Sequence, residues 1–386
     1  MYNLTMRTIV YLDHAATTPI DPSVFAAMTP FLTDKFGNAS SIHSFGREVR
    51  AAVDEARDTV ASAVGADSSE ILFTSGGTEA DNLAILGAAR ANHGKGDHIV
   101  TCVTEHHAVL ESCGQLETEG FRVTYLPVGP DGLLNPDDVA AAINDRTVLV
   151  SVMHVNNEIG VIQQISAIGR LVKERGALFH TDAVQSFGIL PLDVDRLNVD
   201  LLSGSAHKLY GPKGTGFLYV RSGTRVQPLQ FGGGQERERR PGTENVAGVV
   251  GLGAATQLAV SQLDSGPARL AELRDYLIDG AMSRIEGVHL NGHRQLRAPG
   301  NANLSIEGVE GEALLLNLDM AGIAASSGSA CSAGSVRASH VLVALGLPQE
   351  PPQGAVRLTV GRGTSKEDLD YALDTLEAIV ARLRKE

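Results

Sequence analysis

Lys208 lies in a segment that resembles a socket for an aldehyde cofactor. It follows a predicted strand over residues 199–202 and begins a stretch rich in Gly that runs to Gly216. Asp182 follows another apolar segment, so an amine and an acid come after two predicted strands. A lysine that forms a Schiff base and an acid that faces a pyridinium nitrogen are the two groups that pyridoxal phosphate (PLP) most needs. The pair therefore indicates a PLP site.

Cys331 adds a nucleophile to this set. It ends a run of small residues, 326–331, in which poor packing favours a mobile loop. A catalytic thiol must be exposed and partly deprotonated, and a loop provides that setting. Cys102 and Cys113 instead fall in a predicted strand and a predicted helix, where a free cysteine behaves as a small buried hydrophobe. A carbanion-stabilising cofactor with a nucleophilic sulfur indicates chemistry on a sulfur amino acid.

Residues 73–80 run from a predicted strand through Gly76 and Gly77 into a predicted helix. Backbone N–H groups at a helix start, with the hydroxyl of Thr78, can hold a phosphate. An ordinary tight strand–helix turn explains this motif alone equally well. It is not a P-loop, because the Gly-Lys-Ser/Thr ending is missing.

His106 and His107 begin the next predicted strand–helix junction. Adjacent side chains on a helix point apart and no i,i+4 partner follows, so we expect no metal site here. An imidazole that stacks on a cofactor ring and transfers protons fits His106 better. Taken alone, His106 would be read as a capping or packing residue.

Asp182 and Gln185 are three positions apart after a predicted strand. A buried acid that hydrogen-bonds the pyridine nitrogen keeps it protonated, so that the ring can take up electrons from a carbanion. The alternatives are that Asp182 caps a helix and that Lys208 is solvated, as most lysines are. The combination of these residues, and no single one, favours the cofactor.

Apolar segments at residues 71–74, 98–103, 122–126, 147–153, 177–180, 199–203 and 216–220 alternate with helical patterns at 80–90, 108–119, 136–143 and 166–175. This alternation predicts an α/β fold with a mostly parallel sheet that helices cover on both faces. Ligands of such sheets bind outside the carboxyl ends of the strands. Asp182, Asn157, His106 and Thr78 all follow predicted strands, so we expect them in one crevice.

The composition fits a two-domain enzyme. The chain has 386 residues, 43% hydrophobic residues and a formal net charge of −13, which disfavours a nucleic-acid-binding surface. No long apolar span or signal peptide is recognisable, and three irregularly spaced cysteines form neither a disulfide framework nor a zinc pattern, so we expect a cytoplasmic protein. We place a large PLP-binding domain at residues 18–260 and a smaller α/β domain with the Cys331 loop at 1–17 and 261–386.

Several blocks of the chain agree, in order, with one family. These are residues 11–19 (YLDHAATTP), 153–158 (MHVNNE), 232–236 (GGGQE), 240–243 (RPGT) and 357–362 (RLTVGR), together with the segments around Lys208 and Cys331. The sequence resembles the cysteine desulfurases of the nitrogen-fixation and iron–sulfur assembly type, within the class V aminotransferases of PLP-dependent fold type I. The resemblance covers nearly the whole chain.

The resemblance implies a role for each matching residue. Lys208 would hold PLP as a Schiff base and His106 would stack on its ring, while Asp182 would pair with the pyridine nitrogen and Gln185 with the ring oxygen. The phosphate would be held by Gly77, Thr78, Ser205 and His207, with Thr243 contributed by the partner subunit of a homodimer. Asn157 would lie near the ring and the substrate, and Arg357, helped by Asn38, would bind the substrate carboxylate.

The implied reaction takes sulfur from L-cysteine and leaves L-alanine. Lys208 or His106 would remove the α-proton, and the Cys331 thiolate would attack the substrate sulfur to form a persulfide. The long segment from Ser332 to Leu345 resembles the extended-loop branch of the family. The chain lacks the longer C-terminal tail with which some members dock a scaffold, so iron–sulfur cluster assembly, tRNA thiolation and DNA phosphorothioation all remain open for the sulfur-acceptor protein.

Two other functions compete with this one. Another fold type I enzyme, such as an aminotransferase, could use the same socket, but it would need no thiol at Cys331. A non-enzymatic relative within a sulfur-transfer or DNA-modification complex should have lost catalytic residues first, and Lys208, Asp182, His106 and Cys331 are all present.

Overall fold

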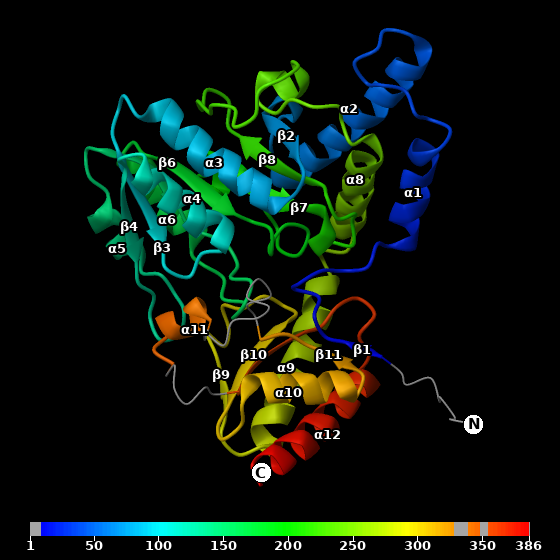
Figure 1. Cartoon of the computed structure of the whole chain (residues 1–386), viewed down its shortest axis with the longest axis vertical. Coiled ribbons are helices and arrows are strands. Elements are labelled where there is room, and N and C mark those ends of the chain that lie inside the picture. The colour runs from blue at the N-terminus through cyan, green and yellow to red at the C-terminus, as the bar shows by residue number, and fades with distance from the viewer. Residues whose placement is uncertain (1–8, 328–338, 348–353, 386) are drawn as a thin grey trace.

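The larger of two structural units is built on a seven-stranded sheet (Figure 1). In this computed structural model the described residues are 9–327, 339–347 and 354–385. The strands are β2 (Ile71–Thr74), β3 (His98–Cys102), β4 (Arg122–Leu126), β5 (Thr147–Ser151), β6 (Leu178–Asp182), β7 (Leu201–Ser205) and β8 (Gly216–Val220), in the order β2-β8-β7-β6-β5-β3-β4. β8 runs antiparallel to both of its neighbours and the remaining pairs are parallel. The predicted mostly parallel α/β fold is confirmed.

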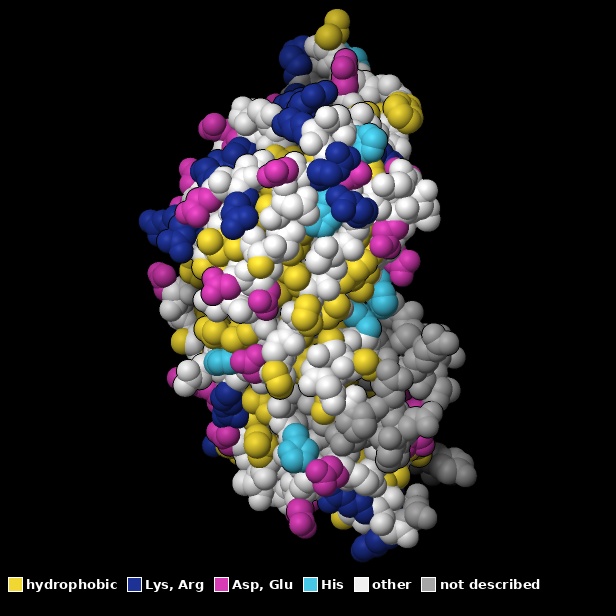
Figure 2. Space-filling view, turned by 90° about the vertical axis from the view of Figure 1, so that its left-hand side faces the viewer, with side chains coloured by type: hydrophobic (Ala, Val, Ile, Leu, Met, Phe, Trp, Pro, Cys, Tyr) yellow, Lys and Arg dark blue, Asp and Glu magenta, His cyan; other side chains and the backbone are white. Residues whose placement is uncertain are grey.

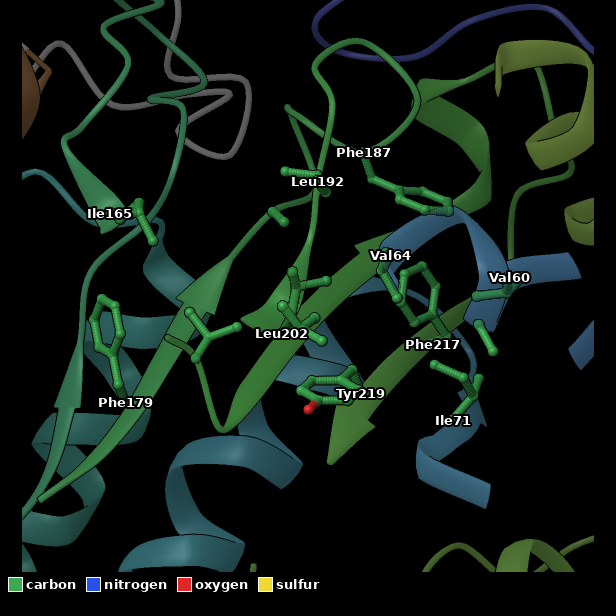
Figure 3. Packing of buried hydrophobic residues seen from close by; sticks show 14 of the residues in the cluster. Val60, Val64, Ile71, Ile165, Phe179, Phe187, Leu192, Leu202, Phe217 and Tyr219 are labelled. Atoms are coloured by element: carbon green, nitrogen blue, oxygen red, sulfur yellow. The ribbon is translucent and has the colours of Figure 1, made fainter. Parts of the chain in front are cut away.

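Helices cover both faces of this sheet (Figure 1). They are α1 (Pro22–Leu32), α2 (Ser44–Val64), α3 (Gly77–Asn92), α4 (His107–Thr118), α5 (Pro136–Ala142), α6 (Ile165–Glu174), α7 (Val194–Leu197) and α8 (Val246–Ser261). Successive strand residues point to opposite faces, so Ile71 and Phe73 join one apolar core and Leu72 joins another. In the first core the rings of Phe187 and Phe217 meet edge to face with centroids 4.8 Å apart (Figure 3).

The smaller unit has its own core beside the carboxyl ends of the large sheet (Figure 1). Its elements are β1 (Val10–Tyr11), α9 (Gly266–Arg284), β9 (Val288–Leu290), β10 (Asn301–Ile306), α10 (Gly311–Met320), β11 (Ile323–Ala324), α11 (His340–Ala344), β12 (Gly354–Thr359) and α12 (Lys366–Leu383). β1 pairs with β11 although more than 300 residues separate them in the chain. The domain boundaries near residues 17 and 260 stay a prediction; the separate cores support them.

Helix α8 packs closely against α1 and α2 through small residues. A Cβ atom at Gly253 would lie 2.8 Å from the Cβ of Ala56, and one at Gly251 would lie 2.6 Å from the sulfur of Met28. Within the described residues no single helix is long and apolar enough to cross a membrane. Helices α8 and α9 taken together are long and apolar enough, but the chain bends by 77° between them. On the face shown in Figure 2, basic side chains are interspersed with acidic ones.

Two predicted element ends differ from the structure in ways that affect the site. Helix α3 begins at Gly77, three residues before the predicted start, which places Thr78 in its first turn. Strand β6 continues past His180 to Asp182, because Thr181 and Asp182 pair with Leu202 and Ser203 of β7. Asp182 is therefore held by the sheet itself.

Candidate functional site

A cavity of about 270 Å³ lies at the carboxyl ends of the large sheet and reaches the small domain. Ten of the residues that sequence analysis singled out line it: Gly77, Thr78, His106, Asn157, Asp182, Gln185, Ser205, His207, Lys208 and Arg357. They come from both domains and span 281 positions of the sequence, from 77 to 357. The predicted convergence of strand ends on one crevice is thus what the structure shows.

Lys208 ends a short 3₁₀ turn, Ala206–Lys208, that directly follows β7. Its Nζ atom donates hydrogen bonds to the carbonyl oxygens of Ala15 and Ala16, at 2.5 and 2.7 Å. The lysine also borders a second cavity of about 420 Å³ on the side of α9, so its side chain stands between two hollows. An amine in this position can reach a ligand and is oriented by two carbonyl groups before the ligand arrives.

Asp182 is a buried acid, 6% exposed, at the end of β6. One of its carboxylate oxygens accepts a hydrogen bond from the backbone N–H of Val184 at 2.8 Å. Burial raises the pKa of Asp182 to about 6, while this hydrogen bond and the nearby Lys208 oppose the rise. The alternative that Asp182 caps a helix is wrong, because the next helix begins only at Val194. Asp182 instead caps the turn after β6, and it borders the cavity. A buried carboxylate of this kind can accept a hydrogen bond from a pyridine nitrogen and thereby keep that nitrogen protonated.

His106 is the N-cap of α4, and its Nδ1 atom accepts a hydrogen bond from the backbone N–H of Ala108 at 3.1 Å. Burial and then the charge of Lys208 lower the pKa of His106 to about 4, so the ring is neutral at pH 7. A neutral imidazole that accepts at Nδ1 carries its proton on Nε2. Among the described residues, no three His, Cys, Asp or Glu side chains are arranged to hold a metal ion.

The turn between β2 and α3 has the features of a phosphate cradle. A Cβ atom at Gly77 would lie 2.6 Å from a methyl carbon of Val184, so this position has no room for a side chain. Facing it, the hydroxyl group of Ser205 is buried and finds no hydrogen-bond partner among the described residues. An unpaired buried hydroxyl is costly, and a phosphate oxygen would satisfy it. His207 lies beside them, 3.1 Å from the hydroxyl of Thr17, and the chain therefore fits PLP at this position.

Arg357 enters the cavity from β12 of the small domain. Its guanidinium donates to a carboxylate oxygen of Asp13 at 2.8 Å and to the carbonyl oxygen of Asn157 at 2.7 Å. On the opposite side Gln185 donates to the carbonyl oxygen of Ala15 at 2.9 Å. Sequence analysis did not single out Asp13, although the residue stands in the matched block 11–19.

Sequence analysis also missed a group of buried ionisable residues below the cavity. Asp81 borders the cavity and is 1% exposed, and Glu105, next to His106, is fully buried. Burial and the nearby Asp182 raise the pKa values of both carboxyl groups well above their usual range. Two features of the sequence could have indicated these residues. Asp81 lies within an apolar helical pattern, and Glu105 directly precedes the candidate His106.

His180 completes this group. It is fully buried in β6, with Nδ1 2.8 Å from the hydroxyl of Ser151 and Nε2 3.0 Å from that of Ser203. Its Nε2 atom lies 3.6 Å from a carboxylate oxygen of Asp81. Burial lowers the pKa of His180 to about 3. The ring is therefore neutral in the folded chain over the physiological range.

We expect His180 to make stability depend on pH. The unfolded chain binds a proton at this residue below about pH 6.5, whereas the folded chain does not until about pH 3. The contribution of His180 to the free energy of unfolding therefore decreases as the pH falls from about 6.5 to about 3. Between about pH 4 and 5.5, the His180→Asn variant should lose about 1.4 kcal/mol less per pH unit than the wild type.

Urea unfolding at several pH values measures the two slopes. Equal slopes for the wild type and His180→Asn would show that burial does not hold His180 neutral.

Two predicted residues, Asn38 and Thr243, are not among the residues that line the cavity. Asn38 is exposed between α1 and α2, where its side-chain oxygen accepts a hydrogen bond from the backbone N–H of Ser40. Thr243 is exposed before α8. Cys331 lies outside the described residues, so its place relative to Lys208 stays a prediction. The other two cysteines are buried as predicted, Cys102 at 1% and Cys113 at 0% exposure, and burial raises the pKa of each thiol to about 12.

Comparison with known proteins places this site in a family. Residues 10–372 match the model of the family described as aminotransferase class-V. A cysteine desulfurase IscS of Dictyoglomus turgidum is 54% identical over 379 residues, covering 98% of this chain and 96% of the relative. A solved NifS-like protein superposes with a TM-score of 0.91 at 36% identity, over 97% of this chain and all of that one. A structure titled SspA in complex with cysteine superposes with a TM-score of 0.82 at 36% identity, over 91% of this chain and 98% of that one.

Proposed function

The chain belongs to the aminotransferase class-V family and is a PLP-dependent cysteine desulfurase, and we propose that Lys208 holds the cofactor and Cys331 takes up the sulfur. The observation that carries the assignment is the cavity in which Lys208, Asp182 and His106 meet, together with a phosphate cradle at Gly77. These groups come from four separate strand ends. Chance would not bring this combination of an amine, a buried acid and a neutral imidazole together.

We assign the remaining cofactor contacts to other residues that line the same cavity. The carboxyl group of Asp182 would face the pyridine nitrogen, His106 would stack on the ring and Gln185 would bond the ring oxygen. The phosphate contacts are assigned to Gly77, Thr78, Ser205 and His207. Buried Ser205, whose hydroxyl lacks a partner among the described residues, supports the phosphate position most directly.

Bound PLP supplies an electron-withdrawing ring that stabilises negative charge at the substrate Cα. Lys208 is better suited than His106 to remove the α-proton. The imidazole of His106 already carries a proton on Nε2, because its Nδ1 accepts from the backbone of α4, and its pKa of about 4 makes further protonation unfavourable. The uncharged amine of Lys208 would have a free electron pair with which to accept that proton.

The sulfur transfer is assigned to Cys331. Its thiolate would attack the sulfur of L-cysteine and form an S–S bond while the substrate Cβ–S bond breaks. The electron pair of that bond passes to the carbon, which is then protonated, so the products are L-alanine and a persulfide on Cys331. No external oxidant or reductant takes part in this step.

The substrate carboxylate is assigned to Arg357. Arg357 lines the cavity and is only 1% exposed to solvent. A charge-assisted hydrogen bond to a carboxylate is strong in such a buried position. Asn157 borders the same part of the cavity, and Asn38 is assigned a supporting contact. Both domains thereby take part in binding one amino acid.

We propose that the enzyme is a homodimer in which Thr243 reaches the phosphate of the partner subunit. Large hydrophobic side chains are exposed at Phe36 (74%), Ile42 (91%) and Phe231 (90%). Exposed apolar side chains of this size are typical of a protein–protein interface. Thr243 is itself exposed and follows Phe231 in the same long connection to α8.

The acceptor of the persulfide sulfur is proposed to be a thiol-bearing protein. A persulfide passes its outer sulfur to an attacking thiolate. Iron–sulfur cluster assembly, tRNA thiolation and DNA phosphorothioation would each provide such an acceptor. Labelling the Cys331 persulfide and trapping the protein that receives the label would identify it.

One assay tests the proposed function. Purified protein loaded with PLP should convert L-cysteine, with dithiothreitol as reductant, to alanine and sulfide in equal amounts. In the same preparation, sedimentation should give the mass of two chains. Transfer of the amino group to a 2-oxo acid without sulfide release would indicate an aminotransferase instead, and a one-chain mass would contradict the dimer.

A further inference from the structure

Two carboxylates fasten residues 235–240, here called the brace segment, to the turn that forms the phosphate cradle. The segment begins with a 3₁₀ turn, Gln235–Glu238, and ends at Arg240. It belongs to the connection between β8 and α8, far in sequence from the cradle at residues 75–78. The roles assigned above use neither carboxylate.

Glu236 binds the strand that leads into the cradle. Its carboxylate is buried and accepts two hydrogen bonds from the guanidinium of Arg57, at 2.6 and 2.7 Å. It accepts a third from the backbone N–H of Phe73, at 3.0 Å, within β2. Arg57 also lies over the Phe73 ring, 4.4 Å from its centroid, and donates to the carbonyl oxygen of Ile71 at 2.8 Å. Glu236 and Arg57 together thus fix β2 at Ile71 and at Phe73, which lies two residues before the turn.

Glu79 binds the turn from its other side. Its carboxylate accepts hydrogen bonds from Arg240 at 2.7 and 3.2 Å and from the backbone N–H of Ser75 at 2.7 Å. Burial alone would raise the pKa of Glu79, but hydrogen bonds from Arg240 and Ser75 outweigh burial and lower it. The ionised carboxylate therefore joins both ends of the residues 75–79 and ties them to Arg240.

The backbone of the brace segment is held in an unfavourable conformation. Glu236, Arg237 and Glu238 have φ angles of 44°, 58° and 63°, in the left-handed region that side chains disfavour. Such residues persist where surrounding contacts dictate their conformation. Arg237 supplies further contacts, because its guanidinium donates to the carbonyl oxygens of Ile71 and Ser68 at 3.0 and 3.2 Å. The contacts that hold Glu236 and Arg237 are thus made with β2, with Arg57 beside it and with the residues just before it.

We propose that Glu79 and Glu236 are positioning residues for the cofactor phosphate. They hold the turn between β2 and α3 so that its backbone N–H groups at Gly77 and Thr78 are fixed before the phosphate arrives. This inference rests on the proposed function, because it takes this turn as the phosphate site. Thr243 lies three residues beyond Arg240 in the same connection to α8.

The test compares two aldehydes on protein stripped of PLP. Pyridoxal has the ring and aldehyde of PLP but no phosphate, and both compounds are titrated by Schiff-base absorption. Loss of a charge-assisted contact predicts that Glu79→Gln binds PLP about tenfold more weakly. Its affinity for pyridoxal should stay within about twofold of wild type, because the Lys208 contacts are unchanged.

Two further variants complete the design. Glu119→Gln is the matched control, because Glu119 forms an equally close two-bond pair with Arg90 but lies at the far end of α4; both affinities should match the wild type. Glu236→Gln should repeat the PLP-specific loss. If it does not fold, Arg57→Lys replaces it, since lysine keeps the charge but cannot form the two-bond contact.

The outcomes separate the inference from its premise. Equal weakening of PLP and pyridoxal by Glu79→Gln would show a general structural role and overturn the inference. Unchanged PLP binding would overturn it as well, because the carboxylate would then not affect the phosphate site. Tighter PLP binding would also overturn it, because the carboxylate would then repel the phosphate. If wild-type protein forms no Schiff base with either aldehyde, the proposed function fails instead.

Discussion

The Cys331→Ser variant should release sulfide from L-cysteine more than about 10³-fold more slowly than the wild type, as expected when a nucleophile is lost. Serine has nearly the same size, but its hydroxyl is not ionised at neutral pH and cannot form a persulfide. The residues that line the cofactor cavity are unchanged by the substitution. The variant should therefore keep the yellow absorption of bound PLP while sulfide release stops.

Cys113→Ser is the matched control for this substitution. Cys113 is fully buried in α4, and burial raises the pKa of its thiol to about 12, so it cannot act as a nucleophile. Its substitution should leave sulfide release nearly unchanged apart from any loss of stability. Mass spectrometry after a single addition of L-cysteine should find an added sulfur on the Cys331 peptide only. Normal sulfide release by Cys331→Ser would contradict the role of the thiol.

The large sheet was predictable because most of its strands are short, apolar and buried, while β4 at its edge is partly exposed. Residues 71–74, 122–126 and 216–220 were predicted with the ends that the structure shows. The carboxyl ends of parallel strands meet at one edge, so the convergence of Asp182, His106 and Thr78 followed from topology alone. Local pattern and fold rules sufficed at these positions.

Contacts between distant segments were not predictable in the same way. Asp13 pairs with Arg357 across 344 positions, and no local pattern of an acid announces such a partner. The left-handed residues Glu236 to Glu238 contradict local propensity. Contacts of Glu236 with Arg57, and of Arg237 with Ile71 and Ser68, hold the first two of them. Asp81 was not singled out, yet its side chain is 1% exposed, and Ala80 and Leu83 beside it on α3 are buried as well. Tertiary packing decided each of these cases.

The end of β6 shows how an error of two residues in a predicted strand end changes the environment expected for Asp182. The prediction ended the strand at His180, before the polar Thr181 and Asp182. The sheet instead pairs both residues with β7. Asp182 is therefore buried by strand pairing, which raises its pKa to about 6, whereas an acid in a loop would stay solvated. The strand end thus sets the electrostatics of the proposed pyridine contact.

The Lys208→Ala variant should lose both the covalent attachment of PLP and the group that we assign as base. Turnover of L-cysteine should fall by at least about 10³-fold, because general base catalysis alone contributes about 10² to 10⁴. Lys208 also donates hydrogen bonds to Ala15 and Ala16, so the variant should lose about 1 to 3 kcal/mol of stability. PLP can still bind through its phosphate, but without a Schiff base.

Reduction with borohydride distinguishes this loss from simple unfolding. In the wild type, reduction should fix PLP on the peptide that contains Lys208, and mass spectrometry should find it there. Lys213→Ala is the matched control, because Lys213 is exposed only five residues further along, and it should keep both label and activity. Lys208→Ala should carry no label while its thermal unfolding stays cooperative. A label on another lysine in the wild type would contradict the assignment of Lys208 as the residue that binds PLP. Turnover by Lys208→Ala at the wild-type rate would contradict its role in the reaction.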